Sequence, residues 1–207
     1  MKIERKTAEI RQPQESAEAL SIDADPMEVF LRWRGDEPEG ALPCVLATAD
    51  AEGRPSARLV DIAWVDEGLV FFTTEGSRKI RDLKDRPGEA CFGWLDRRRQ
   101  VRVRGHATRL DALASDEHFS SLPRGVQLLS WASDQRSEIA MPTETSDRLE
   151  ALARKYAGQE VPRPDRWSGY RLTPDRFEFW QGQDFGFPTR VVSELVADAW
   201  RTRWVTP

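Results

Sequence analysis

The chain is poor in the residues from which metal centres and disulfide frameworks are built. Among its 207 residues there are two cysteines, Cys44 and Cys91, and two histidines, His106 and His118. A structural zinc site needs four nitrogen or sulfur ligands, usually in closely spaced pairs, and this sequence has no such pair. We therefore expect no metal. We expect both cysteines to be reduced thiols buried in strands, because free cysteine is commonly buried and inert.

Long apolar runs and a secretion signal are also missing. The longest apolar stretches, such as residues 68–72, are far too short to span a bilayer, and the polar N-terminus lacks an apolar core. The formal net charge of -4 gives no overall basic surface of the kind that binds nucleic acid. We expect a cytoplasmic protein with no membrane or nucleic-acid partner, and a mobile polar arm over residues 1–24.

Short β-rich runs separated by turn residues dominate the remainder, which we treat as one domain over residues 25–207. We predict strands over residues 44–48, 56–65, 69–74, 89–95, 100–110, 169–172, 176–181, 189–196 and 200–205. Helices are predicted over residues 26–34, 77–86, 111–121 and 146–157, with a short apolar link over 128–133 and a turn at Pro174-Asp175. Many short strands with a few peripheral helices favour a mainly β (α+β) fold that closes, or nearly closes, into a barrel.

Several catalytic devices are absent from the sequence. There is no glycine-rich phosphate loop before a helix, no GxSxG, no HExxH and no Cys/His pairing. No side chain stands out as a nucleophile. A bound cofactor therefore accounts for chemistry better than side-chain catalysis does.

The best local clue is the run Ser77-Arg78-Lys79 at the start of a predicted helix. Ser77 suits the N-cap position, and two cations then occupy the first turn, which is the unfavourable end of the helix dipole for positive charge. An anion bound there would explain the placement, because free backbone N–H groups and two cationic side chains form a phosphate site. The alternative is an ordinary solvated charged face.

Gln100 and Trp180 are weaker candidates. Gln100 follows three arginines, and its amide both donates and accepts, which suits the edge of a heterocycle such as a flavin. The arginine run is equally typical of a solvated hairpin turn. Trp180 ends an apolar strand, where tryptophan is more often a core or interface residue than a cofactor contact.

Taken together, these pieces resemble the pyridoxamine 5'-phosphate oxidase family of FMN proteins, in order along most of the chain from about Asp25. The matching motifs are residues 25–27 (DPM), 57–60 (ARLV), 71–79 (FFTTEGSRK), 99–101 (RQV), 133–135 (SDQ), 167–171 (WSGYR) and 177–182 (FEFWQG). The GSRK and EFWQG pieces at this separation are the most specific.

The resemblance implies an FMN-binding split β-barrel and a homodimer with two FMN sites at the subunit interface. Arg58, Arg78 and Lys79 would hold the FMN phosphate, and Gln100 would meet the polar edge of the flavin. Leu59, Val60, Asp61, Phe72 and Thr73 would line the flavin, and Gln135, Trp180 and Arg190 would come from the second subunit. Arg136, where the family usually has a small hydroxyl residue, is counted with the FMN contacts.

The departures from the family pattern concern the substrate. Ala63 replaces a lysine, and the residues that grip the substrate phosphate, a Tyr, an Arg and a Ser, are replaced by His118, Leu122 and Val126. The family segment Arg-Leu-His-Asp-Arg becomes Gly-Phe-Pro-Thr-Arg, ending at Arg190. A buried dianion without cationic partners is very costly. We therefore predict that pyridoxamine phosphate is not the substrate.

The leading hypothesis is an FMN-dependent oxidase similar to the phenazine-type branch of the family. It would dehydrogenate or aromatise a small intermediate of specialised metabolism, with hydride transfer to the flavin and reoxidation by O2. Ala63, His118, Leu122 and Phe187 would face the substrate.

Individual roles stay open within that hypothesis. His118 is a candidate proton carrier or a surface histidine, Arg124 or Arg136 would pair with a substrate carboxylate, and Phe185 with Phe187 would form an aromatic wall. The alternatives are an ordinary pyridoxamine/pyridoxine 5'-phosphate oxidase of vitamin B6 metabolism and a non-catalytic flavin- or haem-binding protein.

Overall fold

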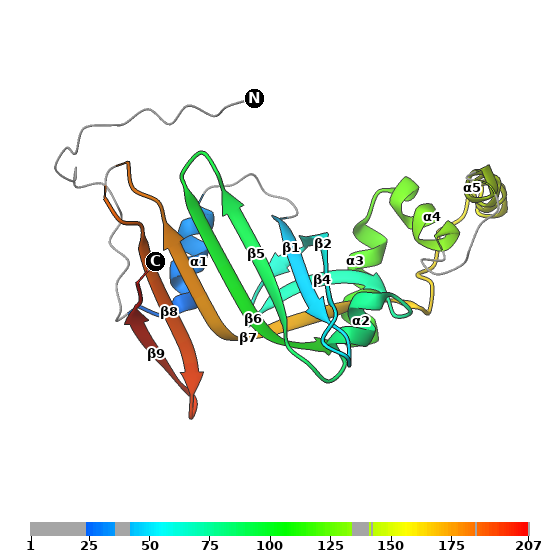
Figure 1. Ribbon diagram of the computed structural model, residues 1–207. Helices are drawn as coiled ribbons and strands as arrows, with labels where there is room; N and C mark the ends of the chain where they lie inside the picture. Colours follow the sequence, from blue (N-terminus) through cyan, green and yellow to red (C-terminus); the bar gives the residue numbers. More distant parts are fainter. Residues whose placement is uncertain (1–23, 36–41, 134–140, 142, 185, 207) are drawn as a thin grey trace. The chain divides into compact units, whose positions relative to one another are not determined.

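The computed structural model describes residues 24–35, 42–133, 141, 143–184 and 186–206 (Figure 1). Its helices are α1 (Pro26–Arg34), α2 (Arg78–Leu83), α3 (Ala112–Ser121), α4 (Arg124–Ala132) and α5 (Thr143–Lys155). Its strands are β1 (Leu42–Ala49), β2 (Pro55–Ile62), β3 (Trp64–Val65), β4 (Leu69–Thr74), β5 (Gly88–Trp94), β6 (Arg99–Arg109), β7 (Trp167–Gln181), β8 (Thr189–Val196) and β9 (Ala199–Trp204). The predicted mainly β class with a few helices is confirmed. Within these ranges no helix is long and apolar enough to cross a bilayer.

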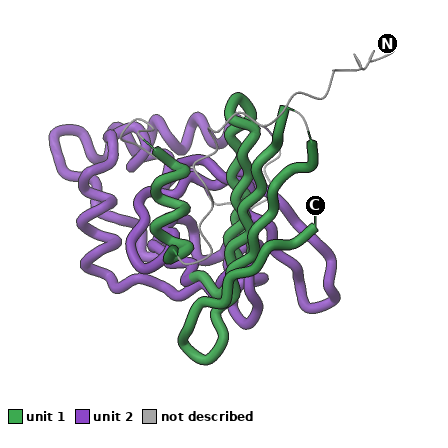
Figure 2. Tube along the Cα trace, turned by 90° about the vertical axis from the view of Figure 1, so that its left-hand side faces the viewer, with its two compact units in different colours: residues 1–40, 89–104, 174–207 green, residues 41–88, 105–173 purple. Residues whose placement is uncertain are grey.

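The chain divides into two compact units, each assembled from separated segments (Figure 2). Unit 1 comprises residues 1–40, 89–104 and 174–207, and unit 2 comprises residues 41–88 and 105–173. Strands β6 and β7 contribute residues to both units. The N-terminal arm that the sequence predicts lies outside the described residues, and the single-domain assignment stays a prediction.

In unit 1, helix α1 has the N-cap and the buried apolar face that its sequence predicts. The carboxylate of Asp25 accepts hydrogen bonds from the backbone N–H groups of Met27 (2.8 Å) and Glu28 (3.3 Å), which caps the helix. The opposite face of the helix is apolar. Phe30 lies 5.0 Å from the ring of Phe92, between centroids, and is fully buried. The antiparallel β7–β8–β9 ladder completes the C-terminal part of this unit.

Unit 2 is built from two antiparallel ladders. Strand β1 pairs with β2 from Leu42–Ile62 to Ala49–Pro55, and alternate residues of β1 are buried. Strand β4 pairs with both β3 and β7. Strand β2 also lies against β4, and α2 lies against β1. This arrangement brings the start of α2 close to the β1–β2 hairpin, which is where the candidate phosphate site forms.

Four sequence predictions need correction. Residues 128–133 are not a link but the end of helix α4, and the predicted strand over 56–65 is interrupted at Ala63. Helix α2 ends at Leu83 rather than at residue 86. Pro174-Asp175 is no turn but lies inside β7, because pairing with β4 ends at Leu172 and pairing with β8 begins only at Arg176. A proline is tolerated where neither of these ladders needs its missing N–H.

Candidate functional site

A cluster of three cations, Arg58, Arg78 and Lys79, gathers at the start of α2 in unit 2. We call it the α2 cation cluster. Arg58 reaches it because alternation along β2 places Arg58 and Val60 on the half-buried face, whereas Leu59, 77% exposed, and Asp61 face outward. The guanidinium Nη1 of Arg58 donates to the carbonyl oxygen of Leu46 (3.0 Å) and to Thr48 Oγ1 (2.9 Å).

In the described part of the chain, the two carboxylates that form ion pairs with this cluster both pair with Arg78. Arg78 is 3.6 Å from an oxygen of Asp50 and 3.6 Å from an oxygen of Asp82. Asp82 is itself engaged by the hydroxyl of Thr48, which donates to it at 2.7 Å. The ammonium of Lys79 donates to Thr73 Oγ1 at 2.9 Å, a bond to a neutral oxygen. The cluster therefore carries positive charge that these two carboxylates do not fully balance.

Electrostatics within the cluster disfavour its charged state. Burial lowers the pKa of Lys79, and the charge of Arg58 lowers it further. Burial also lowers the pKa of Arg58, with Asp82 opposing and Arg78 adding to the shift. Neighbouring cations that depress one another's protonation would be relieved by an anion between them.

Ser77 supplies independent evidence that something is to be bound here. Its side chain is 4% exposed, does not cap α2, and its Oγ has no hydrogen-bond partner within the described part of the chain. A buried hydroxyl without a partner costs about 1–3 kcal/mol. An orphaned hydroxyl beside three cations fits a phosphate group, which accepts hydrogen bonds and is negative. Because α2 has only six residues, this fit rests on side chains rather than on the helix dipole.

A cavity of about 420 Å³ in unit 1 brings together three of the predicted flavin contacts. Gln100, Trp180 and Arg190 all line it, together with Gly93, Trp94, Leu95, Arg98 and Arg99. The resemblance assigned Trp180 and Arg190 to a second subunit, apart from Gln100. In the structure one chain presents all three to the same space, so they can act on one ligand together.

Arg190 is held in this cavity by a buried carboxylate. Its Nε is buried and makes no hydrogen bond among the described residues, but it lies 3.7 Å from Glu178 Oε1. Glu178 is also paired with Arg176 at 2.7 Å and with Arg102 at 3.2 Å. Burial by itself would raise the pKa of Glu178, but the hydrogen bond from Arg176 and the charges of Arg102 and Arg190 outweigh it and lower the pKa.

His118 is half-buried and lies in an aromatic stack in unit 2. Its ring stacks on Phe72 with centroids 4.0 Å apart and an interplanar angle of 17°. Trp64 meets it edge-on at 5.4 Å, and Trp167 lies parallel at 6.2 Å. Burial lowers the pKa of His118, so the imidazole is neutral near pH 7.

The other predicted substrate-facing residues differ in their surroundings. Leu122 packs against the cluster formed by Phe119, Leu128, Tyr156, Val161 and Trp167. Ala63 is half-buried and donates its backbone N–H to the carbonyl of Val70, whereas Phe187 is 87% exposed. The guanidinium of Arg124 donates to the carbonyl oxygens of Gln159 and Tyr156, a structural role that disfavours a substrate contact. Gln135, Arg136 and Phe185 lie outside the described residues.

Sequence reasoning missed the residues that support the cations. Thr48 and Ser56 accept hydrogen bonds from Arg58, and Asp82 accepts one from Thr48. A signal existed for Thr48, because the alternation of β1 places it on the buried face. A buried hydroxyl needs a partner, so a polar residue there indicates a network.

Comparison with known proteins identifies the family. A profile described as "Pyridoxamine 5'-phosphate oxidase" matches residues 36–181, and one for the "Pyridoxine 5'-phosphate oxidase C-terminal dimerisation region" matches residues 167–207. A pyridoxine/pyridoxamine 5'-phosphate oxidase of Rubrobacter xylanophilus is 42% identical, with 86% of this chain and 85% of that protein covered. The corresponding protein of Burkholderia multivorans is 42% identical, with 83% and 81% covered.

A solved structure agrees with this assignment. PhzG of Burkholderia lata, crystallised with tetrahydrophenazine-1-carboxylic acid, superposes with a TM-score of 0.80 at 28% identity, covering 88% of this chain and 93% of that one. An FMN-binding protein of Nostoc punctiforme has a TM-score of 0.63 at 18% identity, covering 80% and 88%, which supports the fold. The predicted split-barrel class is thereby confirmed. The chain belongs to the pyridoxamine 5'-phosphate oxidase family of FMN-dependent oxidases.

Proposed function

We propose that this chain is a homodimeric FMN-dependent oxidase whose substrate is a small ring compound without a phosphate group. The observation that carries the proposal is the environment of His118. It stands where the resemblance places a phosphate-gripping tyrosine, yet it stacks on the ring of Phe72 and its pKa is lowered. Its neighbour in the predicted set, Leu122, packs against an apolar cluster. A phosphate dianion would meet no cation among these side chains.

The chain's own residues divide the work of such an oxidase. Arg58, Arg78 and Lys79 hold the FMN phosphate, and Gln100 both donates to and accepts from the polar edge of the flavin. When bound, FMN supplies the acceptor for a hydride, and O2 serves as the final electron acceptor. The aromatic stack offers a flat apolar surface that excludes water. The neutral imidazole of His118 can accept a proton at its unprotonated ring nitrogen.

Homodimer formation is part of the proposal. The match of residues 167–207 to a dimerisation region supports it. An FMN that bridges two subunits would use the phosphate grip of one and the cavity of the other.

A second candidate is pyridoxine/pyridoxamine 5'-phosphate oxidation. It is favoured by the names of the relatives at 37–42% identity that cover most of the chain. The two candidates differ in one requirement, which is recognition of a substrate phosphate.

Anaerobic flavin reduction separates the candidates. The FMN-loaded protein is mixed with tetrahydrophenazine-1-carboxylic acid, the compound bound to PhzG, or with pyridoxine 5'-phosphate, and flavin absorbance is followed. We expect bleaching by the phosphate-free compound, peroxide release on admission of air, and no bleaching by pyridoxine 5'-phosphate. Bleaching by pyridoxine 5'-phosphate alone would establish the second candidate, and bleaching by neither would indicate a flavin-binding protein without this activity.

A gain-of-function variant sharpens the same test. The double substitution His118→Tyr with Leu122→Arg restores a hydroxyl and a cation at the two positions. We expect it to bind pyridoxine 5'-phosphate at least about 10-fold more tightly than the original chain, since one charged hydrogen bond is worth about 1.5–3 kcal/mol. The single change Leu113→Ala, at a residue of α3 that is 67% exposed and belongs to none of the predicted contacts, serves as the control and should leave that affinity unchanged.

A further inference from the structure

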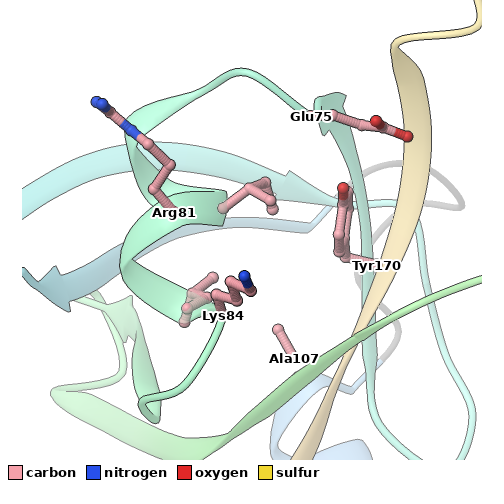
Figure 3. A pocket seen from close by; sticks show the side chains of 7 residues that line it. Glu75, Arg81, Lys84, Ala107 and Tyr170 are labelled. Carbon is pink, nitrogen blue, oxygen red and sulfur yellow. The ribbon is translucent and has the colours of Figure 1, made fainter.

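Unit 2 contains a second cavity, of about 320 Å³, that none of the predicted FMN or substrate contacts lines (Figure 3). We call it the α2 pocket. Its lining residues are Glu75, Ile80, Arg81, Leu83, Lys84, Ala107 and Tyr170. They come from α2 and its flanks, from β6 and from β7. The volume lies within the range of small-molecule sites in proteins.

Lys84 gives the pocket an available positive charge. In the described part of the chain its ammonium forms no ion pair or hydrogen bond. Figure 3 shows the Lys84 side chain directed toward the side of the pocket formed by Tyr170, whereas Arg81 points away from it. A single cation at the edge of a partly apolar space is suited to a monoanion.

Tyr170 supplies a neutral hydrogen-bond donor on the opposite side. Its ring is 7% exposed and is stacked near Phe71 at 6.0 Å, which fixes its direction. Burial raises the pKa of Tyr170, and the charge of Glu75 raises it further against the opposing effect of Arg109. The hydroxyl therefore keeps its proton. Figure 3 shows its oxygen on the Glu75 side of the pocket.

Glu75 does not neutralise Lys84, because its carboxylate is already engaged. Arg109 forms an ion pair with Glu75 Oε1, and Ser168 Oγ donates to the same oxygen at 3.3 Å. The Lys84 ammonium thus remains available. The rest of the wall is apolar, from Ile80, Leu83 and Ala107.

We propose that the α2 pocket is a binding site for a small organic monocarboxylate. Lys84 binds the carboxylate, the Tyr170 hydroxyl donates to it, and the apolar wall contacts the body of the molecule. An inorganic anion would leave the apolar wall unused, and a neutral molecule would leave the Lys84 charge unused. The site is distinct from the flavin and substrate sites, so its ligand binds while FMN is in place.

Benzoate is a suitable probe, with benzamide as its uncharged counterpart. Titration calorimetry on the full, FMN-loaded protein is expected to show saturable benzoate binding with a Kd of about 2 mM, from roughly 0.4 kcal/mol per non-hydrogen atom. Benzamide should bind at least about 10-fold more weakly, as one charged hydrogen bond contributes about 1.5–3 kcal/mol. FMN should not be displaced at saturating benzoate.

Three variants locate the site. Lys84→Ala should weaken benzoate binding at least about 10-fold, and Tyr170→Phe, which removes only the hydroxyl, about 3–10-fold. Lys155→Ala makes the same charge change at an exposed lysine of α5 and should leave benzoate binding unchanged. Thermal unfolding of each variant checks that the fold is retained.

Several results would overturn the proposal. These are equal affinity for benzoate and benzamide, an unchanged benzoate affinity in Lys84→Ala, release of FMN by benzoate, or no binding up to about 50-fold above the expected Kd. Release of FMN would place benzoate in the flavin or substrate site instead.

Discussion

Two charged clusters, one in each unit, differ in how their cations are paired. In unit 1, Glu178 sits among Arg102, Arg176 and Arg190, with ion-pair distances of 2.7 to 3.7 Å. In the described part of unit 2, the ion pairs of the α2 cation cluster are those of Arg78, which lies 3.6 Å from Asp50 and from Asp82.

The pKa shifts within these two clusters run in opposite directions as a result. In unit 1 the pKa of Glu178 is lowered and that of Arg102 is raised, so both charged forms are favoured. In unit 2 the pKa values of Arg58 and Lys79 are lowered, so their charged forms are disfavoured. We expect the paired charges around Glu178 to stabilise the fold, and the incompletely paired charges of the α2 cation cluster to bind a ligand. Substitutions in the first cluster should therefore lower the free energy of unfolding, and those in the second should weaken FMN binding.

The largest effect is expected from Glu178→Gln in the protein without FMN. Removal of the carboxylate takes an ion pair from all three arginines, although Arg102 keeps Glu89 and Arg176 keeps Glu194. Breaking a buried ion pair costs about 3–5 kcal/mol. Because the arginine side chains are 18–37% exposed, we expect the lower end, about 3 kcal/mol, in urea unfolding. Glu150→Gln, which breaks an exposed pair with Arg154, is the control and should change stability by less than about 0.5 kcal/mol. If the two substitutions lowered the free energy of unfolding equally, the ion pairs around Glu178 would have no special role in stability.

Lys79→Met should weaken FMN binding without lowering the free energy of unfolding. It removes a cation of nearly the same length from the phosphate grip, so the Kd for FMN should rise by about 10–100-fold, since a charged hydrogen bond is worth about 1.5–3 kcal/mol. The free energy of unfolding without FMN should stay the same or increase, because burial and Arg58 already oppose the charge of Lys79. Fluorescence titration of FMN and urea unfolding measure the two quantities. A stability loss without an affinity loss would mean that Lys79 is structural.

Ser77→Ala tests the orphaned hydroxyl. Without FMN the variant should be more stable by about 1 kcal/mol, because an unsatisfied buried group is removed. FMN affinity should fall about 3–10-fold, the value of one hydrogen bond of about 0.5–1.5 kcal/mol. Titration with inorganic phosphate in place of FMN should show the same loss of affinity, because the hydroxyl is expected to contact only the phosphate group. If the variant is destabilised instead, the hydroxyl has a partner within the protein.

The smallest effect is a pH dependence that Lys79 contributes. Its pKa is 10.5 when unperturbed and lower in the folded protein. Between these two values the unfolded chain holds one more proton, so the stability of the original chain relative to Lys79→Met rises with pH in that window and is constant below it. Urea unfolding of both proteins at several values from pH 7 to about pH 10.5 measures this difference. A difference that falls with rising pH would mean that Lys79 is stabilised as a cation.

The features predicted correctly from sequence are those that depend on neighbours along the chain. Helix α1 follows from Asp25 and Pro26 at its start. The Ser77–Lys79 run predicts an anion site from neighbouring residues in the same way, and that site stays a prediction. Helix α4 was not predicted because a polar residue, Gln127, lies on its buried face and interrupts the helical spacing of the apolar residues. The side chain of Gln127 donates to the carbonyl oxygen of Phe119 at 2.9 Å.

The features that sequence could not give are contacts between distant segments. His118 stacks on Phe72 although 46 positions separate them in the numbering, and Thr48 donates to Asp82 across 34 positions. No local pattern encodes which helix meets which strand. The aromatic environment that decides the proposed substrate class therefore becomes visible only in the structure.

The interleaving of the two units has a consequence for synthesis. Unit 1 takes residues from three separated segments, the last of which begins at Pro174, whereas all of unit 2 has been translated by Thr173. The apolar face of α1 is made early, but two of the rings it packs against, Phe177 and Phe179, are made much later. Phe30 can meet Phe92 first, but Phe30 and Trp33 complete their ring contacts only after residue 179 has been translated. Translation rate and chaperone supply should therefore affect the yield of unit 1 before they affect unit 2.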